Sequence, residues 1–309
     1  NLRSRIINDF DFRGMDLISK NGIQSNINIF AKNLNTSGKN DEEYKSGLKA
    51  DLKGILELRS SLPMIKADNN YINYLEPKIS LRINPFNMTD YSEADRKINN
   101  NNIFDLNRLG LQDTLESGIN LTLGLNYKKE NLKNINKYFE LKLGTILREE
   151  DENNIPLASG ITKKNSNIFG NLTNQFNKHI SINYDFSLNS EIDKIEYSSL
   201  GFIFSNNRFE TEFNFIEENG VMGDSNIIEN ITSLNFNENN NLSFKTRQNR
   251  KLNMAEYYNL IYEYKNDCLI AGISYDKTYY EDRDLVPSEN LMFKLTLIPI
   301  TTIGQAISK

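Results

Sequence analysis

Few side chains in this sequence have the chemistry or the spacing for catalysis. His179 is the only histidine among 309 residues, and Cys268 is the only cysteine. A serine hydrolase needs its histidine within hydrogen-bond reach of a nucleophile, whereas Asn177-Lys178-His179 has the character of an exposed turn. One histidine and one cysteine also do not make a zinc ligand set. We therefore predict no catalytic residue, no metal site and no cofactor.

Two acidic runs offer a different chemistry. They are Glu149-Glu150-Asp151-Glu152 and Glu281-Asp282-Arg283-Asp284. In loops at an outer surface, these carboxylates could bind divalent cations that bridge anionic lipid headgroups, or they could simply be solvated. The sequence leaves both interpretations open.

Cys268 follows a predicted turn at Asn266-Asp267. A lone cysteine is often a small buried apolar residue, but an odd cysteine in an exported protein also indicates a disulfide partner elsewhere. The chain begins at Asn1 in mid-strand, without Met and without a signal sequence. We expect it to be the C-terminal part of a longer exported protein, so such a partner would precede residue 1.

The elements that position these residues are strands. From Leu121 to Ile300, apolar and polar residues alternate at every second position, with apolar side chains at the odd positions of 121–127 and 209–215 and at the even positions of 180–188. Successive strand side chains point to opposite faces. Each run therefore predicts a strand with one face toward lipid and one toward a polar lumen. The fold class that we predict is all-β, an antiparallel transmembrane β-barrel.

Composition agrees with a barrel. Hydrophobic residues make up 38% of the chain and the mean hydropathy is −0.56, which suits strands that face a wet lumen on one side. No run of about 18 apolar residues predicts a transmembrane helix. The net charge of −5 argues against nucleic acid as a partner. A soluble all-β protein is the alternative that composition leaves open.

We expect one domain over 1–309, with no linker. Short turns at 20–22, 206–207 and 266–267 alternate with long connections at 84–116, 149–167, 218–228 and 280–290, as periplasmic turns alternate with outer loops in a barrel. The predicted strands are 3–18, 23–34, 46–60, 71–83, 117–129, 137–148, 168–174, 179–189, 195–205, 208–217, 229–237, 242–250, 257–265, 268–279 and 291–300.

The loop 84–116 combines apolar side chains, such as Ile103 and Leu109, with charged ones such as Arg108. Such apolar content is unusual for a solvated loop. We predict that the loop folds over or into the barrel, and that Arg108 forms a charge-assisted hydrogen bond with a carboxylate or a barrel carbonyl.

Two segments resemble the LptD family of lipopolysaccharide-assembly proteins, also called organic solvent tolerance proteins. Residues 75–129 contain a loop of the form N-x-F-x-L-N-R-x-G-x-x-D that leads into the strand Leu121-Thr122-Leu123-Gly124-Leu125, and 257–300 resembles the family's cysteine-bearing turn and the strands after it. The loop motif consists of Asn102, Phe104, Asn107, Arg108, Gly110 and Asp113.

The resemblance implies a large barrel in the outer membrane of a Gram-negative bacterium, behind an N-terminal jellyroll that is absent here, as are the first barrel strands. It implies insertion of lipopolysaccharide into the outer leaflet through a seam between the first and last strands, without bond-breaking chemistry and with energy from an inner-membrane ATPase. The implied partners are lipopolysaccharide, a periplasmic Lpt bridge protein, the LptE lipoprotein and outer-membrane lipid. For Cys268 it implies a disulfide to the N-terminal domain.

The resemblance also gives the last predicted strand, 291–300, a role at the lateral seam. Its seam residues would be Phe293, Leu295, Leu297 and Pro299. Pro299 cannot donate a ladder hydrogen bond, so it either weakens the seam or merely ends the strand. A passive porin or receptor barrel is the alternative function, although a porin is expected to end its last strand on an aromatic residue. An outer-membrane hydrolase is the third class.

Overall fold

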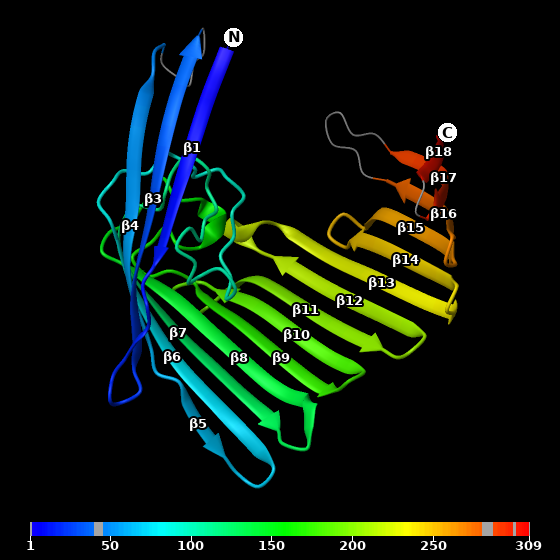
Figure 1. Ribbon diagram of the computed structural model, residues 1–309, viewed down its shortest axis with the longest axis horizontal. Coiled ribbons are helices and arrows are strands. Elements are labelled where there is room, and N and C mark those ends of the chain that lie inside the picture. Colours follow the sequence, from blue (N-terminus) through cyan, green and yellow to red (C-terminus); the bar gives the residue numbers. More distant parts are fainter. Residues whose placement is uncertain (1, 40–45, 280–286, 299–300, 309) are drawn as a thin grey trace.

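The computed structural model describes residues 2–39, 46–279, 287–298 and 301–308. These residues form one antiparallel sheet of 18 strand segments, in which each strand pairs with its neighbour in the chain (Figure 1). The segments β1 and β2 both pair with β3, and β4 and β5 both pair with β6. Among the described residues, β1 and β18 pair on one side only, so the sheet is curved but not closed.

The bounds of the strands follow the predicted order. They are β1 (Leu2–Arg13), β2 (Leu17–Ile18), β3 (Gln24–Lys39), β4 (Lys49–Ser61), β5 (Met64–Ala67), β6 (Tyr71–Asn84), β7 (Gly118–Asn131), β8 (Asn134–Arg148), β9 (Ile168–Asn177), β10 (Ile180–Leu188), β11 (Ile195–Ser205), β12 (Phe209–Glu218), β13 (Ser225–Asn237), β14 (Asn240–Asn249), β15 (Met254–Lys265), β16 (Leu269–Thr278), β17 (Ser288–Leu297) and β18 (Thr301–Ser308). Two short 3-10 helices, η1 (Leu157–Ser159) and η2 (Gly220–Met222), lie in loops.

The period of two in the sequence becomes two faces of the sheet. On β7, Asn120 and Thr122 accept hydrogen bonds from Arg108, which lies inside the curve of the sheet. On β12, Glu212 shares the inner face with Asn214, and Phe213 on the other face is 47% exposed. The outer face of these strands thus carries apolar side chains and the inner face polar ones, as the sequence predicts. The predicted assignment of faces agrees with these contacts.

Connections of two lengths alternate along the chain. Turns of two or three residues join β7 to β8, β9 to β10, β11 to β12, β13 to β14 and β15 to β16. Longer connections, 85–117 and 149–167 above all, lie at the opposite end of the strands (Figure 1). This alternation confirms the predicted alternation of short turns with long connections. No helix among the described residues is long and apolar enough to cross a bilayer.

The structure corrects two of the predicted elements. The connection expected at 61–70 contains β5, which continues the line of β4 along β6 after a break opposite Pro77, a residue that has no N–H for the ladder. The strand 291–300 is not the last, because β18 pairs with β17 over its whole length. Residues 301–308, which follow the last predicted strand, form β18, because strand pairing uses backbone groups and does not require apolar side chains.

Candidate functional site

The apolar core of the molecule lies in the lumen and not between two layers. Residues 85–117, called here the roof loop, fold back into the curve of the sheet together with the second loop, 149–167 (Figure 1). Their apolar side chains pack on the inner face of β8 and β9, close to the second loop. The members of this core are Met88, Ile98, Ile103, Leu109 and Leu111 of the roof loop, Ile155 and Ile161 of the second loop, and Ile146 and Phe169 of the wall.

A buried charge network fixes the roof loop to the wall below this core. Its centre is Glu116, whose side chain is only 3% exposed and accepts hydrogen bonds from three arginines. Arg108 of the roof loop donates from Nε to Glu116 Oε2 at 2.6 Å. Arg82 of β6 donates from Nη1 to the same oxygen at 3.2 Å, and Arg148 of β8 donates to Oε1. The network therefore joins the loop to two strands.

Arg108 uses all three of its nitrogens. Besides Glu116, its guanidinium donates to the Ile103 carbonyl at 3.2 Å, to Thr122 Oγ1 at 2.9 Å and to Asn120 Oδ1 at 3.0 Å. Charge-assisted bonds in a site without water are the strong class of hydrogen bond. The predicted bond between Arg108 and a carboxylate is confirmed, as is the prediction that the loop folds into the barrel.

The electrostatics of Glu116 follow from its neighbours. Burial alone would raise the pKa of its carboxyl, because desolvation disfavours the charged form. The positive charges of Arg108, Arg82 and Arg148 outweigh this effect and hold the pKa of Glu116 far below its ordinary value. The carboxylate is thus ionised at every physiological pH.

Phe104 carries the second attachment of the roof loop. Its ring lies on Gly124 of β7, where an added Cβ would come within 2.5 Å of it. Arg59 of β4 donates to the Phe104 carbonyl, and its guanidinium lies 5.9 Å from the ring centre. Because Gly124 has no side chain, the Phe104 ring can lie directly against the inner face of β7 at this position.

The other motif residues shape the loop itself. Asn102 donates from Nδ2 to the Lys97 carbonyl at 3.1 Å, and Asn107 accepts the Gly110 N–H on its carbonyl at 2.9 Å. Gly110 has φ of 61°, a left-handed conformation that glycine adopts without strain. Asp113 accepts from the Tyr91 hydroxyl and lies 3.9 Å from Arg5 of β1. All six motif residues thus belong to one folded unit.

The second loop completes the roof. Tyr91 N–H donates to the Asn154 carbonyl at 2.9 Å, and Leu157 N–H donates to the Ser92 carbonyl at 3.0 Å. The Ser117 hydroxyl donates to Glu152. These bonds make the two loops one cover over the lumen.

The acidic run 149–152 lies in this second loop. Asp151 accepts the Lys164 N–H at 2.8 Å, and its carboxylate pairs with Lys163 at 3.4 Å. These bonds hold the pKa of Asp151 below its ordinary value, mainly through the Lys164 N–H. A cation at this run stays a prediction, and the run 281–284 lies outside the described residues.

The remaining candidates lie away from the roof. His179 is half-buried in the turn between β9 and β10, where its Nδ1 bonds the main-chain oxygen of Ser205 at 2.6 Å and not a serine hydroxyl. Cys268 is an exposed free thiol in the turn before β16, so the alternative of a buried apolar residue is wrong. Its disulfide stays a prediction. The roles of Phe293, Leu295 and Leu297 also stay predictions, and Pro299 lies outside the described residues.

Sequence reasoning missed the other members of the charge network around Arg108. Glu116, Arg82 and Arg148 lie 8, 26 and 40 positions away in the chain and meet only because neighbouring strands bring them together. The available signal was positional, since Arg82 lies near the end of the strand that leads into the roof loop and Arg148 ends the strand that leads into the second loop.

Comparison with known proteins identifies the family to which this chain belongs. No curated protein matches the sequence. The family model of LptD, LPS transport system D, matches residues 33–219, more than half of the chain. The matched stretch runs from β3 to the end of β12 and includes the roof loop, its charge network and the second loop. The chain therefore belongs to the LptD family.

Proposed function

We propose that this chain forms part of the translocon that inserts lipopolysaccharide into the outer leaflet through a lateral opening in the barrel wall. The observation that carries the proposal is the roof, which packs a buried core and a charge network into the outer mouth of a polar lumen. Lipid that reaches a lumen with a covered mouth has a shorter route sideways between strands than through that packed core.

Family and fold support the coarser part of this function. LptD proteins belong to lipopolysaccharide transport and assembly and are not an enzyme family. Together with the antiparallel sheet, this membership points to the outer membrane of a Gram-negative bacterium. The two faces of the wall suit an amphipathic substrate, because acyl chains match the apolar outer face and charged sugars match the polar inner face.

The partners belong to the same proposal. A periplasmic Lpt bridge protein would deliver lipopolysaccharide to an N-terminal jellyroll, and an LptE lipoprotein would occupy the lumen below the roof. Cys268 is exposed at a short turn. If this turn faces the periplasm, as the proposal requires, Cys268 would form a disulfide to that N-terminal domain. The region described here would then be the C-terminal part of the barrel.

A photo-cross-linking residue in the full-length protein tests this function. Placed at Lys142, on the inner face of β8 beside the cavity under Phe104, it should capture lipopolysaccharide only while the inner-membrane ATPase is supplied with ATP. The matched control is the neighbouring Leu141, which points to the outer face. There, capture of membrane lipid should not depend on ATP.

The same experiment separates the alternative function. A passive porin would show ATP-independent passage of small solutes and no lipopolysaccharide adduct at Lys142 during export. Absence of that adduct in cells that export normally would reject the proposed function. The roof disfavours the porin, because a porin needs an open channel.

A further inference from the structure

The roof loop is held very differently at its two sides. Toward β6–β9 it is fixed by Glu116, by Phe104 on Gly124, and by a core whose members Ile103 and Ile146 are fully buried. Glu116 and the core are buried there, and Phe104 is half-buried. This side of the loop behaves as one body with the wall.

Toward β10–β12 the roof loop is held by little. In the part of the chain that the structure describes, one ion pair joins it to this wall, between Lys97 Nζ and Glu218 at the outer end of β12. The Lys97 side chain is 33% exposed, and its ammonium lies 5.9 Å from the ring centre of Tyr197 on β11. Water reaches this pair, so it is weaker than the bonds around Glu116.

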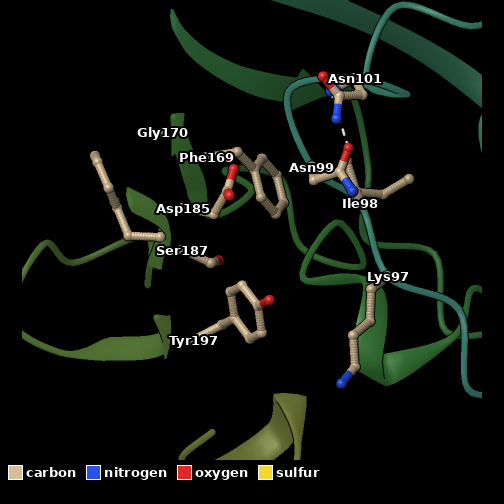
Figure 2. A pocket seen from close by; sticks show the side chains of 10 residues that line it. Lys97, Ile98, Asn99, Asn101, Phe169, Gly170, Asp185, Ser187 and Tyr197 are labelled. Carbon is tan, nitrogen blue, oxygen red and sulfur yellow. Dashed lines mark hydrogen bonds between the residues drawn. The ribbon is translucent and has the colours of Figure 1, made fainter. Parts of the chain in front are cut away.

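A cavity separates the loop from the wall at this place. Figure 2 shows Lys97, Ile98 and Asn99 of the loop facing Asp185 and Tyr197 of the wall across open space. The cavity has a volume of about 190 Å³ and polar residues from both sides line it. The loop is therefore not packed against β10 and β11, and it can leave this wall without breaking a dry core.

The segment beside the cavity is also a self-contained turn. Asn102 donates to the Lys97 carbonyl, and Asn99 N–H donates to Asn102 Oδ1 at 2.8 Å. The Asn101 N–H in turn donates to Asn99 Oδ1 at 2.9 Å. These bonds stay within the turn, so it keeps its shape when Lys97 leaves Glu218.

We propose that Lys97 and Glu218 form a releasable latch, and that the roof opens along β10–β12 while it stays anchored at Glu116. The latch goes beyond the proposed function, because it controls whether ions pass through the mouth of the barrel. It acts even when no lipid is being transported. The opening would lie along the cavity lined by Asp185 and Tyr197.

Charge reversal tests the latch in the full-length protein, by recording ion conductance in planar bilayers that contain no lipopolysaccharide. Lys97→Glu and Glu218→Lys should each raise the fraction of time spent open by about three- to tenfold, because an exposed ion pair becomes a repulsion. The double variant Lys97→Glu with Glu218→Lys restores the pair in reverse. It should return the open fraction to within about twofold of the parent.

The second loop offers a matched control. Lys163 and Asp151 form an exposed ion pair inside that loop and do not reach the wall, so Lys163→Glu should leave conductance unchanged. Amide exchange at 106–111 should match the parent in every latch variant, which shows that the anchor at Glu116 is intact. Single variants that conduct like the parent, or a double variant no closer to the parent than the singles, would overturn the latch.

Discussion

Glu116 is the residue on which the roof depends most. Three arginines lie around one buried carboxylate, and removal of a partner from such a site leaves buried charges without compensation. We predict that Glu116→Gln destabilises the roof by roughly 3 kcal/mol, the lower end of the range for a broken buried ion pair.

The measurement is amide hydrogen exchange at 103–111 in the folded barrel. A loss of about 3 kcal/mol raises exchange by roughly two orders of magnitude. The exposed carboxylate Glu149, directly after Arg148 at the end of β8, is the matched control, and Glu149→Gln should leave the exchange unchanged. Exchange in Glu116→Gln equal to that of the parent would mean that the core alone holds the roof.

Acid should loosen the roof through the same carboxyl. Its pKa in the folded protein lies below the ordinary value of 4.5, so the stabilisation is fully present above pH 4.5 and is lost as the pH falls below it. The loss is about 1.4 kcal/mol for each pH unit in that range. Protection factors at 103–111, which correct for the slower intrinsic exchange at lower pH, should therefore fall from pH 4.5 to pH 3.5 in the parent and much less in Glu116→Gln. An equal fall in both would assign the effect to other carboxyls.

For Arg108, the sequence predicts that the side chain has a buried partner, but not which residue that partner is. A charged residue within an apolar loop predicts a buried partner, and the partner exists. Which carboxylate it is did not follow from local sequence, because Glu116 acquires Arg82 and Arg148 only through strand register. Likewise the short distance between Phe104 and Gly124 depends on how the loop folds back, which periodicity does not report.

At the scale of elements, alternation was the informative signal. Each predicted strand overlaps an observed one, because the period of two reflects a physical requirement of a wall with lipid on one side. The signal failed where that requirement is weak. In β5 all four residues are exposed, and β18 pairs with β17 although its sequence has little apolar character.

The two faces of β12 give a direct test at this scale. A fluorophore attached through cysteine at Phe213 should be quenched by a lipid-phase quencher, whereas one at Glu212 should not, because the two side chains lie on opposite faces. The expected contrast is several-fold, and the pair Phe202 and Ile203 on β11 repeats it. Equal quenching at Glu212 and Phe213 would invert or abolish the assignment of faces.

On the scale of the whole molecule, the bracing of the wall is uneven. Bonds from the roof loop reach β1, β4, β6, β7, β8 and β12. None of these bonds reaches the strands from β14 to β18. A wall that must part for a lipid does so most easily where nothing on the inside holds its strands together, and this places the proposed exit in the C-terminal part of the sheet.

The family resemblance implies a seam between the first and last strands, and β18 is the last strand that the structure describes. We place the exit one strand further in, at the pair β17–β18. Opening it breaks backbone hydrogen bonds in a medium that cannot replace them, so the exit needs strands that are free of other attachments. Leu295 of β17 lies opposite Ile303 of β18 in the register. We predict that a disulfide between cysteines at these two positions blocks lipopolysaccharide export in the full-length protein while the barrel stays folded and inserted.

The braced wall supplies the control for this lock. Leu121 of β7 lies opposite Leu147 of β8, and a disulfide there should leave export unchanged, as should either single cysteine of the β17–β18 pair. Export is measured as newly made lipopolysaccharide at the cell surface, and the native disulfide expected at Cys268 is kept by comparing oxidised variants only. Normal export with β17 and β18 joined would move the exit elsewhere in the wall, since a covalent link across a seam cannot let a lipid with several acyl chains pass between the strands it joins.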